Sequence, residues 1–294
     1  MTFHLPTFFA FARRAPFGNS LTKEQVAGCE AIINAWTGED DRQLAYILAT
    51  SFHETAGTMA PVREGSTRTR RLTDAQARRV TAKYRYGKPD PITGQVYYGR
   101  ADPQLTWKRN YEKMGKALGL NLVDNPDLIL EPATSKRALI LGMVDGMFTG
   151  KKLSDYFNAT KDDPEGARRI VNGTDKASLI AGYHRNFLDS LKAARAAIEN
   201  ERTAAAGQVM AATAFDRARV EAAAIPDGAD LSKDKTAIGG MLAGLGGIGG
   251  IAAFAQPILQ GIASPWAFAA FALVAVGVFL VLTGRVQLKG RAGV

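Results

Sequence analysis

A stretch of 49 residues without a charged side chain, residues 236–284, most restricts how this 294-residue chain can fold. A helix crosses a membrane with about 20 mainly apolar residues, so the stretch is long enough for two crossings. Residues 266–283 are continuously apolar and predict a transmembrane helix. Residues 238–255 carry seven glycines, which fits either a second, closely packed transmembrane helix or a flexible linker.

The composition changes again before this stretch. Residues 193–224 are rich in alanine with interspersed charges, a pattern that favours a helical stalk. We therefore predict three parts: a folded domain over 1–192, a stalk and hinge over 193–235, and a membrane region over 236–294 with one or two transmembrane helices. The N-terminus has its arginines after the apolar run, so we expect no signal peptide.

The first 192 residues predict an all-α domain. Two capping boxes, Thr22 with Gln25 and Thr73 with Gln76, mark helix starts. A helix with an apolar stripe over residues 111–118 is expected to end at Gly119, because glycine is the usual C-terminal cap. Apolar spacing predicts further helices over residues 43–55, 134–147 and 175–200, and a small hairpin over 92–98 stays an alternative for that segment.

Charge and composition exclude several classes of site. The chain has one cysteine, Cys29, and three histidines that are far apart, so no metal site is expected. The net charge is +9, and residues 63–113 hold thirteen Lys and Arg against five Asp and Glu. An anionic partner is expected for this segment, although a merely solvated basic face is the alternative. No nucleic-acid-binding signature accompanies it, so nucleic acid is not expected as a partner.

Two glutamates are candidates for acid–base chemistry. Glu54 lies at the rim of the apolar face of the 43–55 helix, near its end, where a partly desolvated carboxyl suits a general acid. Glu64 follows ten residues later on another segment. Glycoside hydrolysis with inversion uses two carboxyl groups roughly 6.5–9.5 Å apart, one as acid and one as base.

Four ordered motifs then resemble the signatures of family 19 glycoside hydrolases: FHET at 52–55, YYGRADPQLTWKRNY at 97–111, NPDL at 125–128 and IVNGT at 170–174. This family comprises chitinases and the lysozyme-like endolysins of bacteriophages, and the phage branch is the more similar. The resemblance covers about residues 40–190. It implies an all-α, lysozyme-like, two-lobed domain with a cleft, and no metal or cofactor.

The resemblance also implies roles for individual residues. Glu54 corresponds to the general acid, Glu64 to the general base, and the Thr106 hydroxyl to the group that helps hold the attacking water. Substrate-binding positions correspond to His53, Tyr97, Tyr98, Gln104, Asn110 and Asn172.

Each of these assignments has a structural alternative. His53 is more simply a hydrogen-bonded structural imidazole, Tyr97 and Tyr98 are equally well core aromatics, and Asn172 before a glycine fits a turn.

One departure concerns the loop GRADP at residues 99–103, where the family has GRG. Ala101 would cost free energy if the loop requires a positive φ. Asp102 is expected to add a negative charge beside the sugar groove.

We therefore predict a phage-type peptidoglycan hydrolase that cleaves β-1,4 bonds, associated with the host inner membrane or with a virion. Its partners would be the wall glycan and, through the C-terminal region, a lipid bilayer. The alternatives are a chitinase with the same mechanism, and a membrane-anchored glycan-binding or virion structural protein with a degenerate cleft.

Overall fold

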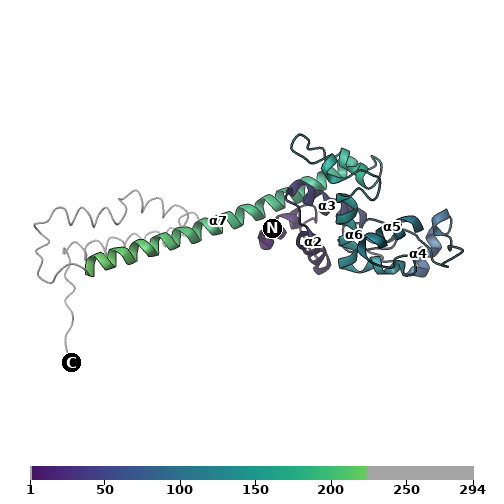
Figure 1. The fold of residues 1–294 in the computed structure, drawn as a ribbon, viewed down its shortest axis with the longest axis horizontal. Helices are drawn as coiled ribbons and strands as arrows, with labels where there is room; N and C mark the ends of the chain where they lie inside the picture. The colour runs from purple at the N-terminus through teal and green to yellow at the C-terminus, as the bar shows by residue number, and fades with distance from the viewer. Residues whose placement is uncertain (1, 224–294) are drawn as a thin grey trace, which may run out of the picture. The chain divides into compact units, whose positions relative to one another are not determined.

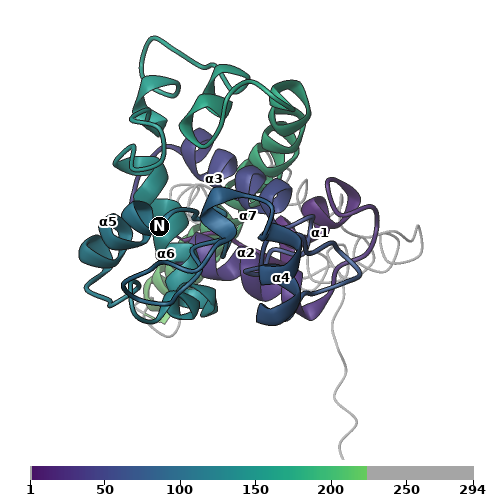
Figure 2. The same cartoon turned by 90° about the vertical axis from the view of Figure 1, so that its right-hand side faces the viewer.

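The structure is a computed structural model that describes residues 2–223, with side chains to residue 217 (Figures 1 and 2). Its internal contacts divide the chain into two compact units, residues 1–202 and residues 203–294. Among the helices of residues 2–223, none is long and apolar enough to cross a membrane. The predicted transmembrane segments at 238–255 and 266–283 lie outside the described residues.

Helices dominate the described residues, which confirms the all-α prediction there. The α-helices are α1 (Leu5–Arg14), α2 (Lys23–Ala35), α3 (Asp41–Glu54), α4 (Asp74–Thr81), α5 (Lys108–Leu118), α6 (Pro132–Val144) and α7 (Ala177–Ala223). The short 3-10 helices are η1 (Arg85–Gly87), η2 (Pro126–Leu130), η3 (Leu153–Asp155) and η4 (Gly166–Ile170). Strand-like pairing within residues 2–223 is limited to the isolated bridges Arg63–Arg100, Arg100–Leu105 and Phe157–Asp162.

Local capping chemistry sets several helix ends as predicted. Thr22 and Gln25 exchange side-chain and backbone hydrogen bonds at the start of α2, and Thr73 and Gln76 do the same at the start of α4. Helix α5 ends at Gly119, whose φ of 70° is left-handed. These ends follow from residues three or four positions apart, which is why the sequence alone predicts them.

The main core surrounds α3. Every residue of α3 from Leu44 to Phe52 is buried, so the helix is covered on all sides and not only along the predicted stripe. Phe52 contacts Phe17, Tyr183 and Phe187 through ring centroids 4.7–6.2 Å apart. This packing holds α3, and with it Glu54 at its end, in one position.

Cys29 of α2 belongs to the same core. It is fully buried, and burial raises the pKa of its thiol to about 12. A desolvated thiolate is unfavourable, so the side chain acts as a small apolar group.

A second buried cluster lies around α5, η2 and α6. Its buried members include Tyr97, Leu105, Tyr111, Leu122 and Ile129. The cluster fixes the 97–107 loop, which carries the longest of the four motifs, against α5. A cleft between two lobes stays a prediction.

The segment at 90–95 turns back on itself without forming a hairpin. Gly94 has a φ of 68° and donates its N–H to Asp90 O at 2.8 Å, while Asp90 N–H donates to Gln95 O at 2.8 Å. The segments on either side form no strand pair, so the alternative of a hairpin over 92–98 is wrong. Lys108 and the turn amides hold the Asp90 carboxylate in place instead.

Candidate active site

Glu54 is the last residue of α3, where the buried helix meets a loop. Its side chain is 15% exposed, and Oε1 accepts a hydrogen bond of 2.6 Å from Nη1 of Arg168. Arg168, in η4, has a side chain only 5% exposed and also donates from Nε to Asp175 O at 3.1 Å. A charge-assisted bond between two largely buried groups fixes the orientation of the Glu54 carboxyl.

His53 precedes Glu54 and is half-buried. Burial lowers the pKa of its imidazole below the ordinary value, since desolvation disfavours the cation. Glu54 opposes this shift and the charge of Arg168 adds to it. The ring is therefore uncharged at neutral pH, and Arg168 is the cation that pairs with Glu54.

Glu64 is held at both carboxylate oxygens. Oε1 accepts from the Tyr86 hydroxyl at 2.7 Å, and Oε2 accepts from the Gly99 N–H at 2.8 Å. The Glu64 N–H donates in turn to Gly99 O at 2.7 Å. The carboxylate is thus oriented by the same residue, Gly99, that pairs with its backbone.

Gly99 and Tyr86 suit these roles for physical reasons. A Cβ at position 99 would lie 2.8 Å from Gln104 Oε1 and 3.0 Å from Glu64 Oε2, so a larger residue would push these two side-chain ends out of their present positions. Burial and the hydrogen bond to Glu64 raise the pKa of Tyr86 above its ordinary value. The hydroxyl therefore keeps its proton and remains a donor to the carboxylate.

The three uncharged polar residues of the QLTWKRN segment build the loop next to Glu64. Gln104 donates from Nε2 to Ala101 O at 2.8 Å and to Val62 O at 3.2 Å. The Thr106 hydroxyl donates to Gln104 O at 2.9 Å, and Asn110 donates to Thr106 O at 2.7 Å. Because the Thr106 proton is used inside the loop, its oxygen is left as an acceptor.

Tyr97 and Tyr98 lie in the interior, 3% and 0% exposed. Tyr97 donates its hydroxyl to Val123 O at 2.9 Å, and Tyr98 donates to Asp74 Oδ1 at 2.6 Å. The Arg100 guanidinium stacks over the Tyr98 ring at 3.6 Å. These contacts correspond to the core-aromatic alternative, so any effect of the two rings on a sugar is indirect.

Asn172 lies in an exposed turn after η4, where its Oδ1 accepts from the Gly173 N–H at 2.8 Å. Its own N–H donates to Arg168 O at 3.0 Å. Asn172 is thereby linked to the residue that pairs with Glu54. It retains a side-chain amide that faces solvent.

The altered loop differs from expectation at one of two positions. Ala101 does have a positive φ, 72°, and is fully buried. Asp102, however, is 0% exposed and contacts Lys136, Ser51 and Ser135. The prediction that Asp102 adds a charge beside the groove is wrong, because the carboxylate points into the protein and is neutralised there.

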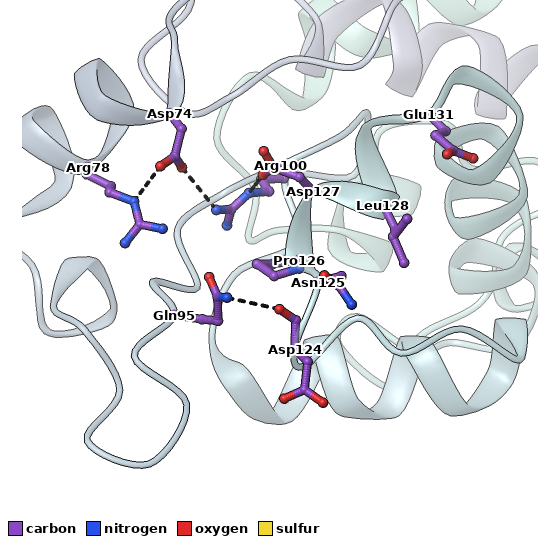
Figure 3. A pocket seen from close by; sticks show the side chains of 10 residues that line it. All are labelled: Asp74, Arg78, Gln95, Arg100, Asp124, Asn125, Pro126, Asp127, Leu128 and Glu131. Atoms are coloured by element: carbon purple, nitrogen blue, oxygen red, sulfur yellow. Dashed lines mark hydrogen bonds and ion pairs between the residues drawn. The ribbon is translucent and has the colours of Figure 1, made fainter.

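A cavity of about 440 Å³ opens beside Arg100 and Asp127 (Figure 3). Arg100 donates from Nε to Asp127 Oδ1 at 2.6 Å and crosses toward Asp74. Residues 125–128, the NPDL segment, form part of its wall. Neither Glu54 nor Glu64 lines this cavity, so NPDL builds a neighbouring polar wall and not the surroundings of the two carboxyls.

Sequence reasoning missed the direct partners of both glutamates. Arg168 lies 114 residues after Glu54, and Tyr86 lies 22 residues after Glu64. Only one local signal pointed to Arg168, namely its position just before the IVNGT motif. Tyr86 lies between motifs, where nothing marks it.

Comparison with known proteins finds similarity to one enzyme family. A family model described as chitinase class I, of the family 19 glycoside hydrolases, matches residues 27–145. Chitinase 11 of Oryza sativa subsp. japonica is 29% identical over 183 residues, which cover 53% of this chain and 66% of that protein. Endochitinase 1 of Theobroma cacao is 34% identical over 113 residues, covering 34% of this chain and 32% of that protein. The chain thus spans less than two thirds of either relative.

Among solved structures, chitinase C from Streptomyces griseus HUT6037 is similar, with 24% identity and a TM-score of 0.41 over 65% of this chain and 95% of that chain. The family match contains Glu54, Glu64 and the 97–111 motif, while Arg168 and Asn172 lie beyond it. The match to residues 27–145 and the chitinase relatives together support a glycoside hydrolase, and the matched segment is similar to family 19.

Proposed function

We propose that this chain hydrolyses the β-1,4 glycosidic bonds of bacterial peptidoglycan by an inverting mechanism with two glutamates. One observation carries the proposal: both glutamates fall within the matched segment, and each is oriented by specific contacts. Solvent weakens exposed ion pairs, so contacts of this kind orient a carboxylate best where it is largely buried, as Glu54 is.

Glu54 acts as the general acid. In its protonated form it carries the proton on Oε2, since Oε1 accepts from Arg168, and it gives this proton to the glycosidic oxygen as the bond from that oxygen to the anomeric carbon breaks. Arg168, 2.6 Å from Glu54 Oε1, stabilises the carboxylate that the transfer leaves. The neutral His53 adds no second positive charge at this point.

Glu64 acts as the general base. Its carboxylate accepts a proton from the water that attacks the anomeric carbon on the opposite face. The Thr106 oxygen can accept a hydrogen bond from the second O–H of that water, because the Thr106 hydroxyl already donates its own proton to Gln104 O. Direct sugar contacts are assigned to the polar side chains of His53, Gln104, Asn110 and Asn172, with Tyr97 and Tyr98 supporting the loop from inside.

The preference for peptidoglycan rests on charge and on the similarity of the 97–111 motif to the sequence of the phage branch. Several cations of the 63–113 segment are exposed in the structure: Arg68, Arg70, Arg79, Lys83, Arg85 and Lys88. An anionic wall polymer is attracted to such a surface, whereas neutral chitin is not. If this segment is only a solvated basic face, binding to the wall glycan should not depend on salt concentration.

Chitin is the second candidate substrate. The names of the matching proteins favour it, since both relatives and the similar solved structure are chitinases. The same two glutamates would serve, because the chemistry at the anomeric carbon does not change with the sugar's substituents.

The apolar residues 236–284 lead us to infer membrane attachment, with the protein held at the host inner membrane or in a virion. Sedimentation of the full chain with bacterial membranes, against a chain that ends at residue 235, tests this attachment. A full chain that stays in the supernatant would contradict it.

Digestion of purified peptidoglycan and of chitin oligosaccharides, followed by mass spectrometry, tests the reaction. The wild type should release saccharides with new reducing ends from peptidoglycan, and Glu54→Gln or Glu64→Gln should lower turnover by about 10²–10⁴-fold. Near-normal turnover in Glu54→Gln would overturn the mechanism.

The same digestion separates the alternatives. Cleavage of chitin alone would establish the chitinase. Binding to the wall without cleavage of either glycan would favour a glycan-binding or virion structural protein with a degenerate cleft.

A further inference from the structure

A buried ion pair lies between the two segments that carry the glutamates. Lys136 belongs to α6, and Asp102 belongs to the altered loop after Gly99. Their side chains are 2% and 0% exposed, and Nζ of Lys136 donates directly to Oδ2 of Asp102. Neither group takes part in the proposed chemistry, so the pair needs another explanation.

The pair is fully satisfied by polar groups from three other positions. Lys136 Nζ also donates to Met59 O at 2.6 Å and to Ser51 Oγ at 3.3 Å. Ser51 donates to Asp102 Oδ2, while Asp102 Oδ1 accepts from Ser135 Oγ at 2.6 Å. The Asp102 N–H donates to the same Ser135 oxygen at 3.0 Å. We refer to these five residues as the clamp.

One end of the clamp leads to Glu54. Ser51 lies on α3 less than one turn before Glu54, and the helix is buried on all sides there. Met59 lies in the loop that leaves α3 and has a strained φ of 58°. Lys136 therefore holds both the end of α3 and the chain that follows it.

The other end leads to Glu64. Ala101, next to Asp102, donates its N–H to Val62 O at 2.9 Å. Gly99 pairs with the Glu64 backbone and donates to its carboxylate at 2.8 Å. A shift of Asp102 would thus be transmitted along two or three residues to Gly99, whose N–H donates to the Glu64 carboxylate.

Stability does not explain the use of charges here. Taking an ion pair out of water costs as much as the attraction returns, and apolar side chains of similar volume often give equal or greater stability. What the charged pair adds is direction, since each hydrogen bond fixes the position of one segment against another.

We propose that the clamp is a positioning device that sets the separation of Glu54 and Glu64. The proposal rests on the proposed function for its catalytic consequence. Asp102 and Lys136 are positioning residues. They connect α3 to the 99–105 loop, and neither of them contacts Glu54 or Glu64. In the GRADP loop, Asp102 then holds the loop in position through its ion pair with Lys136.

Two double variants of the full chain test the clamp. Asp102→Leu with Lys136→Met removes the directional contacts and leaves no unpaired buried charge. Asp102→Asn with Lys136→Gln keeps hydrogen-bonding groups at both positions. A matched control, Asp41→Asn with Arg195→Gln, neutralises an ion pair at the opposite end of α3.

The measurements are kcat and KM on the glycan that the wild type cleaves, together with hydrogen exchange at the Gly99 amide. The apolar double variant should stay folded, lose at least tenfold in kcat with KM within twofold, and exchange the Gly99 amide at least tenfold faster. The hydrogen-bonding double variant and the control should keep kcat within about threefold of wild type.

Unchanged kcat and unchanged Gly99 exchange in the folded apolar variant would overturn the proposal. The exchange measurement needs no substrate. If the wild type cleaves neither glycan, the proposed function fails, and faster Gly99 exchange in the apolar variant alone still supports the coupling between the clamp and the Glu64 donor.

Discussion

At the scale of single residues, the two glutamates differ in what holds them. Glu54 faces a guanidinium, whereas Glu64 faces two neutral donors, the Tyr86 hydroxyl and the Gly99 N–H. A cation next to Glu54 stabilises the charge that an acid acquires when it gives up its proton. Neutral donors orient Glu64 without placing a full positive charge beside the carboxylate that must accept a proton. The two carboxyl groups therefore lie in electrostatically different surroundings.

Tyr86→Phe tests the neutral donors. The change should lower kcat by about 10–100-fold, because a hydrogen bond to a charged group is worth about 1.5–3 kcal/mol. Tyr84→Phe is the control, because Tyr84 stacks on Tyr86 at 5.2 Å and is exposed. Equal kcat values for the two variants would contradict the role of Tyr86.

At the scale of elements, the sequence predicts those features that depend on contacts between residues close together in the chain. The capping boxes of α2 and α4 and the glycine end of α5 depend on contacts within one turn, and all three are confirmed. The site depends on distant contacts. Asp102 meets Lys136 across 34 residues, and its local sequence, next to a groove motif, gave no sign that it points inward. Periodicity also missed that α3 is buried on every side, since a stripe is all that spacing can indicate.

Lys136→Met alone tests the energetics of the element contacts in α6. This change leaves the Asp102 carboxylate buried without its cation, which should lower the free energy of unfolding by about 3–5 kcal/mol. Adding Asp102→Leu should recover most of the loss, because no buried charge remains. Chemical denaturation of both variants measures the difference. Equal stability of the single and double variants would show that Asp102 is not a charged group in the folded protein.

At the scale of the whole first unit, α7 is tied to α3 through a histidine. His184 Nε2 lies 3.1 Å from Arg42 O, and its ring packs against Tyr46 and Phe157 with centroids 5.8 and 5.2 Å away. Burial lowers the pKa of His184 to about 4. Folding therefore favours the neutral imidazole, because burial penalises the protonated ring more than the hydrogen bond to Arg42 O favours it.

This contact makes stability depend on pH. The unfolded chain takes up the His184 proton near pH 6.5, while the folded chain does so only near pH 4. The free energy of unfolding should therefore be unaffected by this group above about pH 6.5 and should fall by up to about 3 kcal/mol as the pH drops to about 4. Denaturation between pH 7.5 and 4 measures the slope, with His184→Leu as the variant that lacks it. Parallel slopes for the two proteins would refute the assignment.

The buried thiol of Cys29 has a consequence for where such a protein can work. With a single cysteine in the chain and a pKa of about 12, almost no thiolate forms at physiological pH. In the folded domain this thiol therefore reacts with neither oxidants nor reductants. Transfer between a reducing and an oxidising compartment would leave this buried thiol unchanged.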